Sequence, residues 1–187
     1  AGGLATHPGA EAKAAGDGRL DYVDTLAALN AMLPQDRILA VDAGRFMIKT
    51  LEHIEVTAPR RMVHTASFGS IGLGMAYAIG AGAADPERPV VLFVGDGGFM
   101  LGGLTEFNSA VRNRTNLIVI VCNDGSYGAE HVQLRNKQMD PGLILFDWPD
   151  LAPVARALGG RGVTVRTSAD LGTVREEIAK GGGPLLV

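Results

Sequence analysis

The stretch VVLFVGDGGFMLGGLTEFNSAVRNRTNLIVIVCNDGSYG, residues 90–128, decides the fold of this chain. Residues 90–94 and 117–122 are short apolar runs rich in β-branched side chains, a pattern typical of strands buried on both faces. The segment between them predicts a helix, because its apolar residues recur at helical spacing: Leu104, Phe107, Ala110 and Val111. The stretch therefore predicts a strand, a helix and a second, parallel strand.

Each predicted strand ends in a polar turn, at residues 95–98 (GDGG) and 123–125 (NDG). Two parallel strands joined by a helix place both turns at the carboxyl edge of the sheet, where open α/β sheets bind their ligands. We therefore expect Asp96 and Asn123 to lie side by side, although 26 residues separate them in the sequence.

These two turns offer hard oxygen ligands for a divalent cation. A carboxylate, an amide oxygen and free backbone carbonyls suit Mg²⁺ or Ca²⁺, and Mg²⁺ completes its shell with water and phosphate oxygens. The backbone N–H groups of Gly97, Gly98 and Phe99, close to a helix start, are suited to holding those phosphates. The pattern predicts a site that clamps a metal ion on a diphosphate.

Gly95-Asp96-Gly97, a gap of 25 residues and Asn123 together resemble the signature of thiamine diphosphate-dependent enzymes. The family motif ends in two adjacent asparagines, and Cys122 stands where the first would be. The resemblance implies that Asp96, Asn123 and the backbone carbonyl of Gly125 hold Mg²⁺ on the diphosphate of the cofactor.

Two further features of this resemblance concern the metal and the diphosphate turn. A shift of the motif by one residue would make Asp124 the metal ligand in place of Asn123, and this alternative stays open. Gly98 completes the turn that would hold the diphosphate.

A second block, Gly69-Ser70-Ile71-Gly72 followed by a small-residue helix, resembles the segment that holds the aminopyrimidine ring in this family. Ile71 matches the apolar wedge that bends the cofactor, and the backbone of Gly69 and Ile71 would bind the ring edge, with Ser70 between them. Tyr127 lies in a segment that reaches over the cofactor in relatives. Glu130 stands where pyruvate decarboxylase-like relatives carry a glutamate that assists proton transfer, although a solvated carboxylate on a helix is equally compatible with the pattern.

The 187 residues are enough for one α/β domain with a real core, and we expect a single doubly wound, mainly parallel sheet with helices on both faces. Residues 1–19, rich in Ala and Gly, are predicted to be a flexible linker, and residues 20–187 the diphosphate-binding domain. The last residues look like the start of a buried strand, so both ends favour a piece of a larger protein.

Composition excludes several classes of protein. No apolar run reaches the eighteen or so residues that a membrane span requires, and a net charge of −3 offers no broad basic surface for nucleic acid. A single cysteine cannot form an internal disulfide, which fits the reducing cytoplasm. The dinucleotide fingerprint G-x-G-x-x-G is absent, which disfavours a nicotinamide oxidoreductase.

The resemblance also implies what this chain lacks. In the family, a glutamate on a separate pyrimidine-binding domain, usually of a neighbouring subunit, activates the cofactor. We therefore expect half of an acetolactate synthase-, benzoylformate decarboxylase- or pyruvate decarboxylase-like active site in a homo- or hetero-oligomer, inactive alone, with a small 2-oxo acid as substrate. The alternatives are a natural small subunit of a two-chain 2-oxo acid decarboxylase and a non-catalytic module that has lost the cofactor.

Several residues have simpler expected roles. Asp42 reads as a helix cap, Cys122 as a buried strand residue and Trp148 as the anchor of a loop. His53 is expected in a loop, and His64 could line the pocket. Further along the chain, the pattern predicts a strand at residues 163–165 and a helix from Ser168, with the Ser168 side chain as its N-cap.

Overall fold

The structure, a computed structural model, describes residues 20–187, and the expected linker at residues 1–19 lies outside the described part. The described chain forms one six-stranded sheet in the order β2-β1-β3-β4-β6-β5. All neighbouring strands pair in parallel, which confirms the predicted α/β class. The strands are β1 (Ile38–Val41), β2 (Met62–His64), β3 (Val90–Gly95), β4 (Leu117–Cys122), β5 (Arg161–Gly162) and β6 (Leu185–Leu186).

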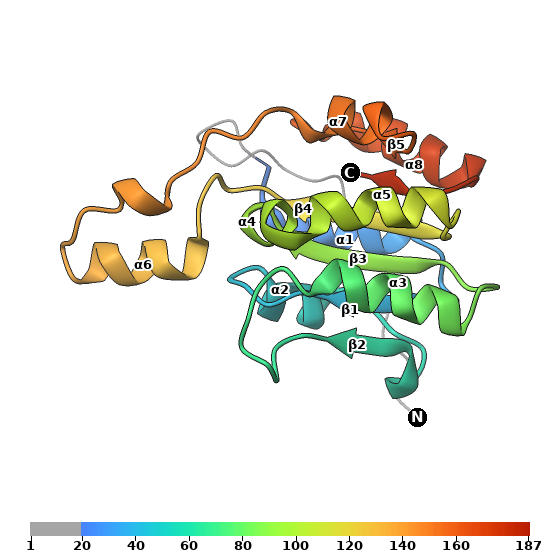
Figure 1. Ribbon diagram of the computed structural model, residues 1–187, viewed down its shortest axis with the longest axis horizontal. Helices are drawn as coiled ribbons and strands as arrows, with labels where there is room; N and C mark the ends of the chain where they lie inside the picture. Colours follow the sequence, from blue (N-terminus) through green and yellow to red (C-terminus); the bar gives the residue numbers. More distant parts are fainter. Residues whose placement is uncertain (1–19) are drawn as a thin grey trace.

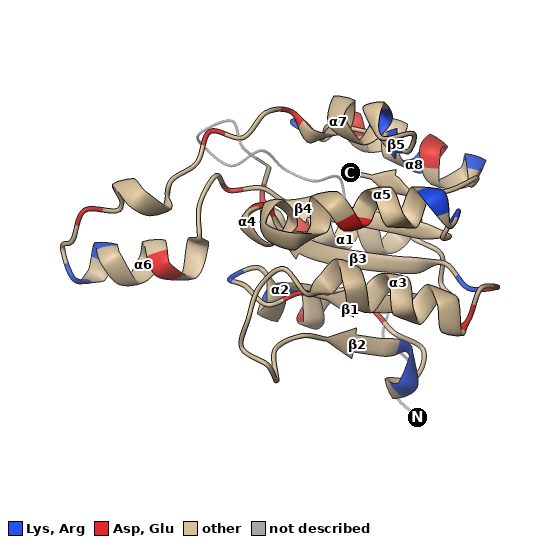
Figure 2. Ribbon diagram, in the orientation of Figure 1, with Lys and Arg blue, Asp and Glu red and all other residues tan. Residues whose placement is uncertain are grey.

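Helices cover both faces of the sheet, as Figure 1 shows. The α-helices are α1 (Tyr22–Met32), α2 (Met47–His53), α3 (Gly74–Ala84), α4 (Asp96–Gly98), α5 (Leu104–Arg112), α6 (Gly128–Asn136), α7 (Leu151–Ala157) and α8 (Asp170–Lys180). Three shorter turns join them: η1 (Pro59–Arg61), the π-helical turn η2 (Phe99–Gly103) and η3 (Gly142–Ile144). The helix α3 contains no charged residue and is drawn entirely tan in Figure 2.

The alternation of side chains along the central strand explains the two layers of core. Successive side chains of a strand point to opposite faces of the sheet. In β3, Val90, Leu92 and Val94 pack into the layer beneath α3, α5 and α7. Val91 and Phe93 pack into the opposite layer beneath α1 and α8. A strand buried on both faces therefore needs the continuous apolar run that the sequence shows.

Three expectations about element boundaries were wrong. The fifth strand is Arg161–Gly162 instead of residues 163–165, although the Val163 N–H still donates to the Leu186 carbonyl at 2.8 Å. The helix α8 begins at Asp170, and the carboxylate of this residue, not Ser168, accepts hydrogen bonds from the backbone before the helix. His53 ends α2 instead of lying in a loop, and its ring contacts the Lys49 carbonyl at 2.9 Å.

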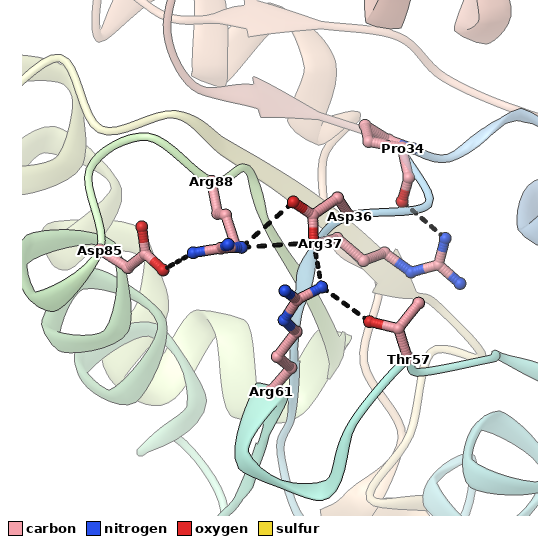
Figure 3. A network of polar contacts seen from close by, with 7 residues as sticks. All are labelled: Pro34, Asp36, Arg37, Thr57, Arg61, Asp85 and Arg88. Carbon is pink, nitrogen blue, oxygen red and sulfur yellow. Dashed lines mark hydrogen bonds and ion pairs between the residues drawn. The ribbon is translucent and has the colours of Figure 1, made fainter.

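Figure 3 shows a network of charged residues at the amino edge of the sheet, opposite the ligand edge. Asp36, just before β1, pairs with Arg61 of η1 and with Arg88, which precedes β3. Arg88 also pairs with Asp85 at the end of α3, and Arg61 donates to Thr57 Oγ1 at 2.8 Å. The network therefore joins the starts of the three neighbouring strands β2, β1 and β3, on the far side from the polar turns.

None of the described helices is long and apolar enough to cross a membrane.

Candidate metal and diphosphate site

The strand register brings the two polar turns together. Gly95, the last residue of β3, pairs with Cys122, the last residue of β4. Asp96 and Asn123 therefore occupy the next position on adjacent strands, at the carboxyl edge of the sheet. Asp42 follows β1 at the same edge.

Asp96 is buried, with only 2% of its surface exposed. Its Oδ2 atom accepts a hydrogen bond from the indole Nε1 of Trp148 at 2.8 Å. Burial raises the pKa of the Asp96 carboxyl, and the nearby Asp124 carboxylate raises it further. The hydrogen bonds from Trp148 and the backbone of Gly97 act against this rise. The sheet therefore holds a desolvated carboxylate whose charge is unfavourable without a cation.

This raised pKa predicts that Asp96→Asn stabilises the cofactor-free chain near neutral pH. A carboxyl whose pKa is higher in the folded than in the unfolded state contributes most to stability below its unfolded pKa, about 4. That contribution is lost as the pH rises through the folded pKa. We expect a higher urea midpoint for Asp96→Asn than for the parent chain at pH 7.5, and little difference at pH 3.5. A parent chain that is the more stable at pH 7.5 would contradict this reading.

The turn after β4 supplies the other candidate oxygens. Asn123 is exposed, and its Oδ1 accepts the Gly125 N–H at 3.0 Å. The Gly125 carbonyl accepts the Phe146 N–H at 2.8 Å. A carbonyl oxygen has two lone pairs, so both atoms keep one for a cation. Gly125 has φ of 68°, a left-handed conformation that glycine adopts without strain.

Asp124, the alternative ligand, is held by its own turn. Its Oδ1 accepts from the N–H of Ser126 at 3.1 Å and from the Ser126 hydroxyl at 2.9 Å. The side chain of Asp124 thus organises the turn after β4, whereas the amide of Asn123 follows directly from the strand that pairs with β3.

A helix begins directly after β3. Gly95 is in the extended region with φ −73° and ψ 155°, and Asp96 opens α4, which runs through η2 into α5. The N–H groups of a first helical turn lack intrahelical acceptors and attract anions. A Cβ atom on Gly97 would lie 2.5 Å from Cε1 of Tyr127, so only glycine leaves room for this ring against the turn.

The block that contains Ile71 is fastened by Asp42, which is fully buried. Asp42 Oδ1 accepts the Thr65 hydroxyl at 2.8 Å, and Oδ2 accepts the Gly72 N–H at 2.8 Å. The expectation of a helix cap at Asp42 was therefore wrong: its side chain ties down the loop between β2 and α3. This loop carries Gly69, in a left-handed conformation with φ of 72°, and Ser70, whose hydroxyl donates to the Ile71 carbonyl at 3.1 Å.

A cavity of about 1500 Å³ lies at the carboxyl edge. Predicted site residues that line it are Ile71, Gly95, Asp96, Gly97, Gly98, Asn123, Gly125, Tyr127 and Glu130. Gly69, Ser70 and His64 are not among its lining residues. Glu130 is exposed on α6, a helix without buried residues that stands away from the sheet in Figure 1.

A small polar cluster lies beneath the turn after β4. The Tyr22 hydroxyl lies 2.7 Å from Thr50 Oγ1 and 3.3 Å from Cys122 Sγ. Burial, and secondarily Cys122, raises the pKa of the Tyr22 phenol. Burial also raises the pKa of the Cys122 thiol to about 12, helped by the charges of Asp96 and Asp124. Both groups are therefore neutral at physiological pH.

We expect the Cys122 thiol to resist alkylation in the folded chain. Its pKa rises from 9.0 to about 12, so the reactive thiolate is about 1000-fold rarer than in the unfolded chain near pH 8. Iodoacetamide at pH 8 should modify the native chain at least about 100-fold more slowly than the chain in 8 M urea, as followed by mass spectrometry. Cys122 is partly buried and lines the cavity, so equal rates in both states would show that its surroundings do not protect the thiol.

The donor set fits Mg²⁺ bound to a phosphorylated ligand. Among residues 20–187, no three His, Cys, Asp or Glu side chains gather as a metal site. One buried carboxylate, one amide oxygen and one carbonyl remain, together with backbone N–H groups at a helix start. Mg²⁺ is commonly bound through one or two carboxylates plus substrate phosphates. The chemistry of this edge therefore suits a phosphorylated ligand held through a divalent cation.

Comparison with known proteins identifies the family. Residues 42–187 match the family model described as "Thiamine pyrophosphate enzyme, C-terminal TPP binding domain". This chain belongs to that family, and the match confirms the resemblance found in the sequence.

Individual relatives carry the names of a synthase, a lyase and a decarboxylase. The chain is 31% identical over 168 residues to the acetolactate synthase large subunit IlvG of Mycobacterium tuberculosis, covering 86% of this chain and 29% of the relative. It is 30% identical to human 2-hydroxyacyl-CoA lyase 2, covering 77% of this chain and 23% of that protein. The structure of thiamine diphosphate-dependent 4-hydroxybenzoylformate decarboxylase from Rhodococcus jostii RHA1 is similar, with a TM-score of 0.80, 28% identity and coverage of 94% of this chain and 33% of that one. The chain thus spans 23–33% of the length of these relatives.

Two contacts of the site were missed by sequence reasoning. Trp148 was expected only to anchor a loop, but it binds the carboxylate of Asp96, 52 residues away. Asp42 binds Gly72, 30 residues away. No periodicity or spacing in the sequence predicts either contact. The one available signal is that residue 148, between Asp147 and Pro149, is the single tryptophan of the chain.

Proposed function

We propose that this chain holds the magnesium and diphosphate end of thiamine diphosphate in an enzyme that acts on 2-oxo acids, by decarboxylation or by carboligation like an acetolactate synthase. The observation that carries the proposal is the pairing of Gly95 with Cys122, which sets Asp96 beside Asn123 at the start of a helix. Family membership and the synthase, lyase and decarboxylase relatives support the reaction class.

In this proposal each oxygen of the site has one task. Asp96 supplies the carboxylate, and Asn123 and the Gly125 carbonyl supply neutral oxygens to Mg²⁺. The N–H groups of Gly97 and Gly98 bind the diphosphate oxygens that the cation does not neutralise. When bound, thiamine diphosphate supplies the carbon nucleophile that attacks the 2-oxo acid, and the protein supplies binding and orientation.

The loop after β2 would position the other end of the cofactor. Asp42 fixes Gly72, and so fixes the backbone of Ile71 next to it. Ile71 lines the cavity, which supports its role as the apolar wedge, with Gly69 and Ser70 beside it in the same loop. Tyr127, packed on Gly97, would contact the cofactor near its diphosphate. Glu130 lines the same cavity from α6 and is the candidate for proton transfer.

A second domain would complete this site. Apolar side chains are exposed near the carboxyl edge, with Phe68 76% exposed and Leu101 63% exposed. Exposed apolar surface of this kind marks contacts with other protein domains. We propose that a pyrimidine-binding domain carrying the activating glutamate docks there, in a cytoplasmic homo- or hetero-oligomer, and that the present chain alone is inactive.

Calorimetric titration tests the proposal most directly. We expect thiamine diphosphate with Mg²⁺ to bind the 187-residue chain. Thiamine monophosphate with Mg²⁺ should bind much more weakly, because it lacks the second phosphate group that the proposed site would hold. Adding a candidate pyrimidine-binding domain should tighten binding. A chain that binds neither compound, even with that domain present, would favour a non-catalytic module instead.

A further inference from the structure

Trp148 belongs to a short segment that returns over the site after α6. Residues 144–148, which we call the aromatic strap, pair with the turn after β4. The Tyr127 N–H donates to the Ile144 carbonyl at 3.0 Å, and the Phe146 N–H donates to the Gly125 carbonyl at 2.8 Å. An antiparallel bridge between Ser126 and Leu145 lies between these two bonds. The backbone therefore fixes the strap against the same turn that carries Asn123.

Stacked rings then fix the indole of Trp148. The rings of Phe146 and Trp148 are 4.6 Å apart with an angle of 23° between their planes. Phe146 meets Tyr127 edge to face at 4.8 Å, and Tyr127 packs on Gly97. Such aromatic contacts are worth about 0.5–1.5 kcal/mol each beyond the area that they bury. The indole thus has a defined orientation, and its N–H points at Asp96.

The hydrogen bond from the indole engages one particular oxygen of the Asp96 carboxylate. Oδ2 accepts the indole N–H at 2.8 Å, inside the range of a strong hydrogen bond. The carboxylate is 2% exposed, so little water is available to orient it instead. Partners that hold a ligating carboxylate in one orientation typically change metal affinity by about 10–100-fold.

We propose that Trp148 is a positioning residue for the metal site: its indole N–H holds Oδ2 of Asp96 and directs Oδ1 toward the cation. This inference rests on the proposed function and adds a residue that the strand motif does not contain. The aromatic strap thereby links the orientation of the metal ligand to the path of the chain after α6.

The hydrogen bond itself can be tested without any metal. Trp148 is the one tryptophan of the 187-residue chain, so a ¹⁵N-labelled sample gives a single indole N–H resonance. We expect Asp96→Ala to shift this resonance upfield, because the indole loses its acceptor. The matched control is Asp124→Ala, which removes a nearby carboxylate that does not bind the indole and should leave the resonance almost unchanged. An indole resonance that does not respond to Asp96→Ala would overturn the proposal.

The positioning role is tested with Trp148→Phe, which keeps a ring for stacking on Phe146 but has no N–H. Mn²⁺ is titrated into the full chain at a fixed concentration of thiamine diphosphate and followed by electron paramagnetic resonance. We expect the Kd for Mn²⁺ to rise about 10–100-fold. Phe146→Leu, which keeps the indole N–H but loses the stack, should raise it less. Circular dichroism and the urea midpoint check that each variant is folded.

The outcomes distinguish a failure of the positioning role of Trp148 from a failure of the proposed metal site. If the parent chain binds Mn²⁺ and Trp148→Phe binds it as well or better, the positioning role is wrong and the metal site stands. If the parent chain binds no Mn²⁺ with both the cofactor and a candidate pyrimidine-binding domain present, the proposed function fails and the positioning role with it. Should Trp148→Phe not fold, the response of the indole resonance of the parent chain to Mg²⁺ and thiamine diphosphate decides, and an unchanged resonance overturns the inference.

Discussion

Asp96→Ala should abolish the binding of thiamine diphosphate with Mg²⁺, a loss of about 100-fold or more in affinity. Asp96 is the carboxylate that directly follows β3, and the strand register places it beside Asn123. Without it, the cation would depend on two neutral oxygens and the diphosphate. The calorimetric titration that detects binding to the parent chain should detect no heat with the variant.

Two control variants make this result specific to Asp96. Asn123→Ala should also weaken binding, whereas Asp124→Ala should leave the affinity within about threefold, because Asp124 serves its own turn through Ser126. Loss of binding in Asp124→Ala with binding retained in Asn123→Ala would shift the metal site by one residue. Equal binding by the parent chain and by Asp96→Ala would remove Asp96 from the site.

Local patterns predict the part of this site that lies on strands. Each of the two apolar runs ends at a polar turn, and parallel pairing of the runs fixes the relative position of those turns. In the structure, Gly95 pairs with Cys122, so the two turns follow directly from adjacent positions. This arrangement could be predicted because a parallel β-α-β unit returns each strand in the same direction, so that the sequence order of the turns determines their place on one edge.

The contacts that support the site depend on chain paths that no local pattern encodes. Trp148 reaches Asp96 because the chain after α6 turns back and pairs with residues 125–127. Asp42 lies at the end of β1 as expected, but its partners belong to the loop after β2. An aspartate after a strand reads equally well as a helix cap, and only the tertiary packing that buries it decides between the two roles.

Asp42→Ala is expected to cause the largest loss of stability among the substitutions considered. The side chain is fully buried, and its removal leaves the Thr65 hydroxyl and the Gly72 N–H without their acceptor. An unsatisfied buried polar group costs about 1–3 kcal/mol, so the two together should cost about 2–6 kcal/mol. This is a large fraction of the total stability of a domain, about 5–15 kcal/mol.

Urea unfolding measures this loss, and we expect the midpoint of Asp42→Ala to fall by about 1–2 M. Asp42→Asn should fall in between, since an amide keeps one acceptor for Thr65 but turns a donor toward the Gly72 N–H. Asp36→Ala is the matched control, because Asp36 is 62% exposed in its ion pairs and should shift the midpoint much less. If Asp42→Ala unfolds within about 0.3 M of the parent chain, the loop that carries Ile71 is held by other contacts. A large loss in Asp42→Ala together with weakened cofactor binding in Asp42→Asn would instead show that the end of β1 helps to position Ile71 as well as to stabilise the fold.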